Sequence, residues 1–150
     1  MRHLVPLTAI ALFLEVSFAH AQCAPPPAGA WGRYGIGPGQ FATPFGVAID
    51  SDGIVYITDE GNSRVQKFHS NGTYIGEWST GADTNPTGIA ISPTGVVYVV
   101  LHHVHLVAMY TTSGNPLGTF GTPGSTLYYP VGIALGSGRV YVASSQSARI

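Results

Sequence analysis

The chain has few charged residues: Asp, Glu, Lys and Arg make up 9% of its 150 residues, against about 25% in an average soluble domain. The net charge is −1, and the six Lys and Arg residues are scattered along the sequence. A nucleic-acid-binding surface needs clustered basic side chains that neutralise phosphates. The sequence has no such cluster, so we exclude nucleic acid as a partner.

Cysteine, helical periodicity and catalytic motifs are also scarce. The single cysteine, Cys23, excludes an intrachain disulfide. No stretch after residue 21 shows a convincing apolar periodicity of the i, i+3, i+4 kind, so no helix is expected there. The sequence contains no Gly-x-Ser-x-Gly motif, no phosphate-binding loop and no Cys–His nucleophile arrangement. It therefore gives no indication of the common hydrolase and nucleotide-binding classes.

What the sequence does contain is a phrase that returns three times, at intervals of 42 and 44 residues. It reads Pro-Phe-Gly-Val-Ala-Ile at residues 44–49, Pro-Thr-Gly-Ile-Ala-Ile at 86–91 and Pro-Val-Gly-Ile-Ala-Leu at 130–135. A Gly-containing turn follows each phrase, and then an apolar run with Tyr at 54–57, 96–99 and 139–142. A fixed period of this size indicates a repeat architecture, in which no single unit buries its own apolar surface.

Two further strands are expected in each complete unit, at 64–68 and 73–78 in the first and at 106–110 and 116–120 in the second. The first two strands of a unit are apolar, so we expect both of their faces to be buried. The last two carry Arg64, Gln66, Lys67 and Glu77 in the first unit, so we expect them to be partly solvated. This pattern favours a β-propeller of four-stranded antiparallel blades over a two-sheet sandwich. Gly and Ala alternate with bulky residues in the first strand, which favours close packing between neighbouring blades.

The first unit resembles the NHL repeat. The residues that carry the resemblance are Pro-x-Gly-Val-Ala-Ile-Asp at 44–50, Gly-x-Val-Tyr-Ile-Thr-Asp at 53–59, Asn-Ser-Arg-Val-Gln-Lys-Phe at 62–68 and the lead-in Gly-Ile-Gly-Pro-Gly-Gln-Phe at 35–41. The resemblance extends over residues 31–150 and weakens in the last two strands of the later units. It implies a propeller of about six blades.

The expected organisation is a signal peptide at 1–21, a Pro/Ala/Gly-rich linker at 22–30 and a partial propeller at 31–150, with repeat units at about 44–78, 86–120 and 130–150. Residues 4–14 are apolar but too few to span a membrane as a helix. Ala-His-Ala at 19–21 is a cleavage site, so we expect cleavage after Ala21 and a secreted or periplasmic location. Cys23 suggests a lipoprotein as the alternative, but Gln22 stands where a lipoprotein signal has a small residue.

About three blades are expected, and the third stops inside its third strand. Two interpretations stay open: the residues belong to a longer ring, or they form a half-propeller that self-association completes. Propellers usually have four to eight blades.

Histidines form the sharpest local anomaly of the sequence. His102, His103 and His105 lie in the expected turn between the second and third strands of the second unit. Imidazoles bind zinc and copper, and these three are the candidates for a metal site. The alternative is a solvated turn that contains histidine. The family resemblance favours the alternative, because amidating lyases built on NHL propellers draw their metal-binding histidines from different blades. We assign no catalytic or cofactor-binding residue.

Three other segments carry polar or aromatic residues with two interpretations each. Asp59, Asn62 and Arg64 are expected to hold a turn, with an Arg64–Asp59 ion pair, and the alternative is a catalytic cluster. The segment 50–53 is interpreted as a hairpin turn, since it lacks the other ligands of a calcium loop. Tyr128 and Tyr129 form either an aromatic binding patch or packing between blades. Asn-Gly-Thr at 71–73 is a glycosylation sequon that matters only in a eukaryotic secretory pathway.

These patterns together predict an exported propeller that acts as a rigid, non-catalytic binding scaffold for a protein or carbohydrate ligand. The alternative is a propeller enzyme of the lyase or lactone-hydrolase type, with a metal in the central channel and key residues beyond Ile150.

Overall fold

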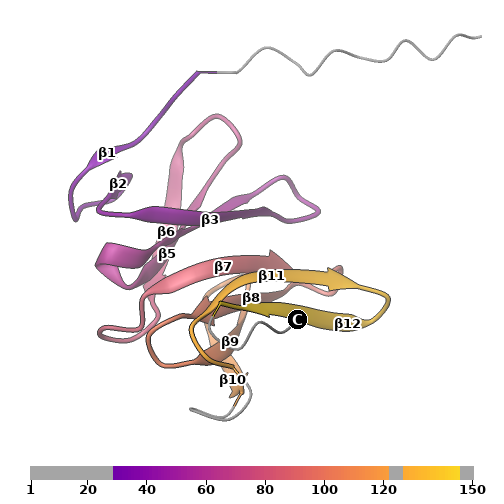
Figure 1. Cartoon of the computed structure of the whole chain (residues 1–150). Helices are drawn as coiled ribbons and strands as arrows, with labels where there is room; N and C mark the ends of the chain where they lie inside the picture. Colours follow the sequence, from indigo (N-terminus) through magenta and orange to yellow (C-terminus); the bar gives the residue numbers. More distant parts are fainter. Residues whose placement is uncertain (1–28, 122–126, 146–150) are drawn as a thin grey trace, which may run out of the picture.

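A computed structural model describes residues 29–121 and 127–145 of the chain, and these residues form a set of antiparallel β-sheets (Figure 1). The expected signal peptide, its cleavage site, Cys23 and most of the expected linker lie outside the described residues. The predicted fold class, a β-propeller of four-stranded antiparallel blades, is confirmed by this arrangement and by the structural comparisons given below.

The first two sheets each have four strands in chain order. Blade 1 consists of β3 (Pro44–Ile49), β4 (Val55–Asp59), β5 (Arg64–Phe68) and β6 (Tyr74–Ser79). Blade 2 consists of β7 (Pro86–Ile91), β8 (Val96–Leu101), β9 (Leu106–Thr111) and β10 (Pro116–Phe120). Blade 3 is described as the hairpin of β11 (Pro130–Gly136) and β12 (Arg139–Ser144). A short parallel pair, β1 (Arg33–Tyr34) and β2 (Gln40–Phe41), precedes blade 1.

The β11–β12 hairpin shows why the turns have the residues they have. Ser137 and Gly138 connect the two strands, and both have positive φ angles, of 50° and 73°. Two successive positive φ angles define the tight turn whose twist matches paired strands. The expected Gly-containing turn of the third unit is therefore a two-residue hairpin.

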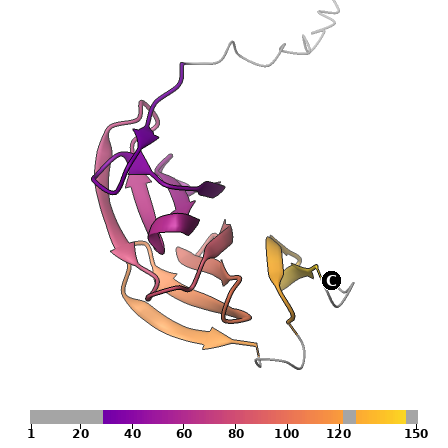
Figure 2. The same ribbon diagram turned by 60° about the vertical axis from the view of Figure 1, so that its left-hand side comes forward.

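The first strands of the three blades pack side by side, β3 against β7 and β7 against β11, and the blades fan out from them (Figure 2). A Cβ atom at Gly46 would collide with the carbonyl oxygen of Thr87 in the next blade. A Cβ at Gly88 would lie 2.7 Å from the carbonyl oxygen of Val131. Only glycine allows this approach, so the repeated phrase is the innermost strand of each blade, as its small residues predicted.

A buried hydroxyl also joins blades 1 and 2. Thr58 in β4 is fully buried, and its Oγ1 donates a hydrogen bond of 2.6 Å to the carbonyl oxygen of Thr87. Thr58 Oγ1 also accepts a hydrogen bond of 2.7 Å from the amide of Gly46. Thr58 thus satisfies two backbone groups at the place where the inner strands are closest.

Two apolar clusters fill the spaces between the blades. The larger lies between blades 1 and 2 and the smaller between blades 2 and 3. Their buried members are Tyr56, Val65, Ile89, Val97, Val99, Leu101, Ala108 and Tyr110 in the first, and Val100, Val107 and Val142 in the second. Because strands β8 and β9 contribute to both clusters, these two strands of blade 2 are buried on both faces.

The expected order of burial within a blade is right for blade 2 and wrong for blade 1. Strand β5 of blade 1 is almost wholly buried although it carries Arg64 and Gln66, whereas β3 exposes Phe45, Val47 and Ile49. Strand β5 is buried because the segment 35–41 lies over its polar side chains, as the hydrogen bonds below show. Among the described residues no sheet covers the bulky face of β3, while β3 itself covers the equivalent face of β7.

Helical structure is limited to one turn in the described part of the chain, a 3-10 helix η1 at Glu60–Asn62 between β4 and β5. Residues 29–121 and 127–145 contain no apolar helix of membrane-spanning length.

Candidate functional site

The histidine turn, residues 102–105, connects β8 to β9, as the sequence predicted. Each imidazole there meets a different part of the backbone through Nδ1. The Nδ1 atom of His102 lies 2.9 Å from the carbonyl oxygen of Pro130, and that of His103 lies 2.9 Å from the carbonyl oxygen of Asp83. The Nδ1 atom of His105 accepts a hydrogen bond of 3.0 Å from the amide of Tyr129. In the described ranges, no group of three or more His, Cys, Asp or Glu side chains is placed to hold a metal ion.

Two tyrosine rings pack against the His105 imidazole. The Tyr128 ring stacks on the imidazole, with centroids 4.9 Å apart and planes 8° apart, and Tyr129 meets it edge-on at 4.7 Å. Tyr128 is 43% exposed, and Tyr129 is half-buried. The histidine turn therefore packs against the segment that leads into blade 3. Of the two interpretations for the tyrosines, packing between blades describes Tyr129, while Tyr128 keeps an exposed ring.

The second polar cluster centres on Asp59, which is fully buried at the end of β4. Its Oδ1 accepts hydrogen bonds from the amides of Ala42 and Thr43, at 3.0 and 3.2 Å. Its Oδ2 accepts from Asn62 Nδ2 at 2.7 Å and from Arg64 Nε at 3.1 Å. The predicted Arg64–Asp59 ion pair is confirmed.

The remaining donors of Arg64 bind the lead-in segment, residues 35–41, and Glu77. Nη1 donates to the carbonyl oxygen of Ile36 at 2.8 Å and to Glu77 Oε2 at 3.0 Å. Nη2 donates to the carbonyl oxygens of Gly37 and Gln40, at 3.1 and 2.7 Å. The guanidinium is thus saturated by groups of the protein itself, so the interpretation of this cluster as structural agrees with its geometry.

Two cavities lie at equivalent positions between successive blades. Each is bounded by the turn after the first strand of one blade, by the same turn of the next blade, and by the Tyr in the second strand of the first of these blades. We name them after that residue. The Tyr56 cavity, between blades 1 and 2, has a volume of about 390 Å³. The Tyr98 cavity, between blades 2 and 3, has a volume of about 280 Å³.

The protein's own charged side chains occupy the polar positions of the Tyr56 cavity. The Tyr56 hydroxyl donates a hydrogen bond of 2.9 Å to Asp50 Oδ2. Burial, then the hydrogen bond and charge of Asp50, raise the pKa of Tyr56 above its ordinary value. Lys67 donates from Nζ to the carbonyl oxygen of Thr112 at 2.8 Å, and its ammonium lies 5.5 Å from the centre of the Tyr56 ring. The Lys67 contact joins β5 of blade 1 to the turn after β9 of blade 2.

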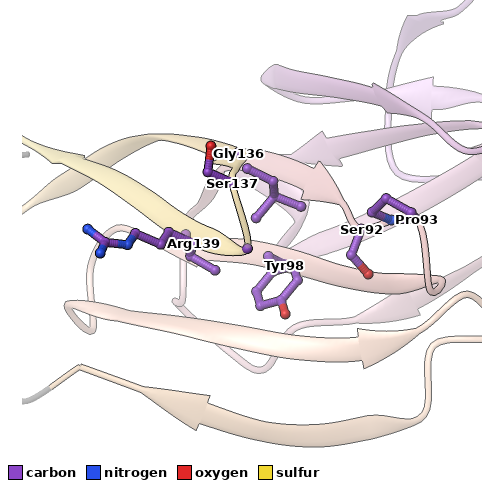
Figure 3. Close-up of a pocket in the computed structure, with 9 residues that line it drawn as sticks. Ser92, Pro93, Tyr98, Gly136, Ser137 and Arg139 are labelled. Atoms are coloured by element: carbon purple, nitrogen blue, oxygen red, sulfur yellow. The ribbon is translucent and has the colours of Figure 1, made fainter.

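The Tyr98 cavity has a different lining (Figure 3). Ser92 and Pro93 of blade 2 face Gly136 and Ser137 of blade 3, with the Tyr98 ring between them. Leu135, Gly138, Arg139 and Val140 complete the wall. No Asp, Glu or Lys is among these residues. Since apolar cavities with a few polar groups are the usual places for small ligands, the Tyr98 cavity is the candidate binding site.

Sequence reasoning missed both cavities. Each depends on two turns about 40 residues apart that meet only in the folded propeller. A signal was present: aligned with the first unit, the second has Ser92 in place of Asp50 and Met109 in place of Lys67. The absence of both charges from the second unit could have distinguished the Tyr98 cavity from the Tyr56 cavity.

Comparisons with known proteins support the fold. A profile of the NHL repeat matches residues 41–68. The human NHL repeat-containing protein 3 is 41% identical over 49 residues, which are 32% of this chain and 14% of that protein.

Three solved structures share the fold with low sequence identity. A virginiamycin B lyase from Staphylococcus aureus has a TM-score of 0.56 at 24% identity, covering 64% of this chain and 32% of that one. The hydrazine synthase of Kuenenia stuttgartiensis has a TM-score of 0.60 at 20% identity, covering 70% and 30%. A putative 6-phosphogluconolactonase from Bacteroides uniformis has a TM-score of 0.57 at 18% identity, covering 67% and 33%. The chain therefore spans about a third of the length of these structures, and the likeness concerns the fold alone.

Proposed function

Because the chain is an NHL-repeat protein with the β-propeller fold, we propose that it acts as an exported, rigid binding scaffold that performs no catalysis itself. One observation carries the proposal. The buried polar side chains Thr58, Asp59, Arg64 and Gln66 of blade 1 are engaged with other groups of the protein, while the Tyr98 cavity between blades 2 and 3 has no Asp, Glu or Lys in its lining.

The engagement of the polar residues argues against a reactive role for them. Asp59 accepts four hydrogen bonds, and Arg64 donates to five oxygens. A general base or an anion-binding guanidinium needs free lone pairs or free donors that face the substrate. Neither residue has them, so both support the scaffold and leave binding to other surfaces.

Export is the second part of the proposal, and it rests on the signal peptide expected at residues 1–21. The test is expression of the full chain in a secreting host, followed by mass spectrometry of the product in the medium or periplasm. The expected product begins at Gln22. A cytoplasmic product that retains Met1 and the apolar run would contradict export.

The binding role is tested with the same secreted protein on arrays of oligosaccharides and peptides. Saturable binding is expected, with the ligand recovered at unchanged mass and with metal content well below one ion per chain. The solved neighbours include a lyase and a putative 6-phosphogluconolactonase, so cleavage of a bound ligand would be the opposing result. Ligand conversion, stoichiometric zinc or copper, or no saturable binding to any member of the arrays would overturn the scaffold proposal.

A further inference from the structure

We propose that the Tyr98 cavity binds a small apolar carboxylate, an organic acid with one ring or a short alkyl chain. This inference rests on the proposed binding function and specifies the ligand class of one site. Three features of the cavity carry it: an unused phenol donor, a cation without an acidic partner among the described residues, and an apolar wall.

The phenol donor is recognised by comparison between repeats. In the first unit the protein supplies a carboxylate to the tyrosine, because Asp50 Oδ2 accepts from the Tyr56 hydroxyl at 2.9 Å. In the second unit Ser92 takes the place of Asp50, and its hydroxyl accepts from the amide of Val96 at 3.0 Å within the turn. Among the described residues the Tyr98 hydroxyl has no hydrogen-bond partner. A ligand carboxylate would fill the position that Asp50 occupies beside Tyr56.

The charge at the cavity has the sign that a carboxylate requires. In the register of blade 2, Met109 lies opposite Tyr98, where blade 1 has Lys67 opposite Tyr56. The cation at the Tyr98 cavity comes instead from Arg139, the first residue of β12. Arg139 is exposed and makes no ion pair within the described residues. A guanidinium binds a carboxylate through two parallel hydrogen bonds.

The Arg139 side chain must change its rotamer before its guanidinium can contact a ligand in the cavity. Its aliphatic stem lines the cavity, and its guanidinium extends away from Tyr98 (Figure 3). An exposed arginine changes rotamer on the nanosecond timescale, so the guanidinium can turn toward a bound carboxylate. The ligand is thus expected to order this side chain.

Size and lining restrict the rest of the ligand. The walls are the Tyr98 ring, Pro93, Leu135 and the side chain of Val140. A volume of about 280 Å³ lies near the lower limit of small-molecule sites, about 300 Å³. One aromatic ring or a short alkyl chain therefore fits the apolar part, with the carboxylate directed to Tyr98 and Arg139.

Benzoate is the probe for the experiment, and benzyl alcohol is its uncharged counterpart of similar shape. Both are titrated by NMR into the full secreted chain at constant ionic strength. Saturable benzoate binding is expected, with a dissociation constant on the order of 1 mM for so small a ligand. Benzyl alcohol is expected to bind about tenfold more weakly. Equal affinity for the two probes would overturn the proposal.

Two substitutions locate the site. Arg139→Gln removes the charge but keeps the stem, and it should weaken benzoate binding about tenfold. The matched control is Arg33→Gln, at an exposed arginine in β1, which should leave benzoate affinity unchanged. An equal effect of both substitutions would show attraction by net charge alone and would contradict the site.

Ser92→Asp is the sharpest variant, because it copies the first repeat into the second. The two turns make the same backbone hydrogen bonds, from residue 50 or 92 to 54 or 96 and from 53 or 95 to 50 or 92. The aspartate should therefore fold there, accept from the Tyr98 hydroxyl and repel the ligand carboxylate. Loss of benzoate binding with an unchanged melting temperature is expected. Undiminished binding in this folded variant would overturn the proposal.

The outcomes separate this inference from the proposed function. If array ligands bind but benzoate does not, the scaffold proposal stands and the cavity assignment fails. If benzoate binds in the Tyr98 cavity but the protein converts an array ligand, the cavity assignment stands and the non-catalytic scaffold fails.

Discussion

The place where a side chain would begin on Gly46 is occupied by the carbonyl oxygen of Thr87 in the next blade. The φ angle of Gly46 is outside the positive range, so the backbone itself would accept alanine. The restriction is one of space between two inner strands. A residue without a side chain therefore determines how closely blades 1 and 2 approach.

Gly46→Ala is expected to destabilise the chain by about 1–3 kcal/mol, or to prevent folding, because the two backbones must separate. Gly76→Ala is the control: Gly76 lies in β6, and nothing lies within 4 Å of its added Cβ. Urea denaturation should give a free energy of unfolding for Gly76→Ala that equals or slightly exceeds that of the parent chain. Equal losses in the two variants would contradict the close-approach explanation.

The hydroxyl of Thr87 is buried without a hydrogen-bond partner among the described residues. Thr87→Val removes an unsatisfied donor and keeps the shape, and the third unit has Val131 at this position. We expect the free energy of unfolding to stay equal or to rise by up to about 1 kcal/mol.

Thr58→Val is the matched comparison, and it should lower the free energy of unfolding. The Thr58 hydroxyl donates to the Thr87 carbonyl oxygen and accepts from the Gly46 amide. A loss of about 1–3 kcal/mol is expected from the two buried groups left unpaired. The second unit carries Val100 at this position, so the change is not one of size. Equal changes in the free energy of unfolding for Thr58→Val and Thr87→Val would contradict this explanation.

Asp59→Asn removes the fully buried one of the two carboxylates that pair with the buried guanidinium of Arg64, and the expected loss is about 3–5 kcal/mol. Exposed Asp83→Asn should change stability by less than about 0.5 kcal/mol. Thermal melts of the two variants provide the comparison. Hydrogen exchange should also accelerate at the amides of Ala42 and Thr43, which Asp59 holds.

Stability should fall at alkaline pH, in part through Tyr56. Burial is the largest cause that raises its pKa, and the hydrogen bond to Asp50 comes next. The folded state therefore holds the phenol proton more tightly than the unfolded chain. The contribution is complete below the ordinary tyrosine pKa of about 10 and is lost as the pH rises beyond it. Tyr56→Phe should flatten the decline of the melting temperature above pH 10, and an unchanged decline would contradict this assignment.

The repeated phrase predicted the fold because its requirements are local. Pro, Gly and Ala at fixed places describe a strand that must approach its neighbour closely, and Gly46 and Gly88 do so. The turns followed from their glycines in the same way. These features need only the neighbouring residues and the repeat period.

Burial of β5 and the Tyr98 cavity could not be predicted in that way. Arg64 is polar in any sequence pattern, and it is buried here because carbonyl groups of a segment 24 to 28 residues earlier surround it. The three histidines share one turn, yet their partners Pro130, Asp83 and Tyr129 lie on different segments. Contacts of this kind depend on where distant segments meet.

The contacts of Arg64 also determine where the folding unit must begin. The match to the NHL repeat starts at Phe41, but the carbonyl oxygens that Arg64 binds start at Ile36. A truncation that starts at Phe41 would delete every backbone acceptor of this guanidinium and leave a cation buried beside Asp59. The sequence that blade 1 needs for its contacts is therefore longer than one repeat, and it includes residues from the segment that precedes the repeat.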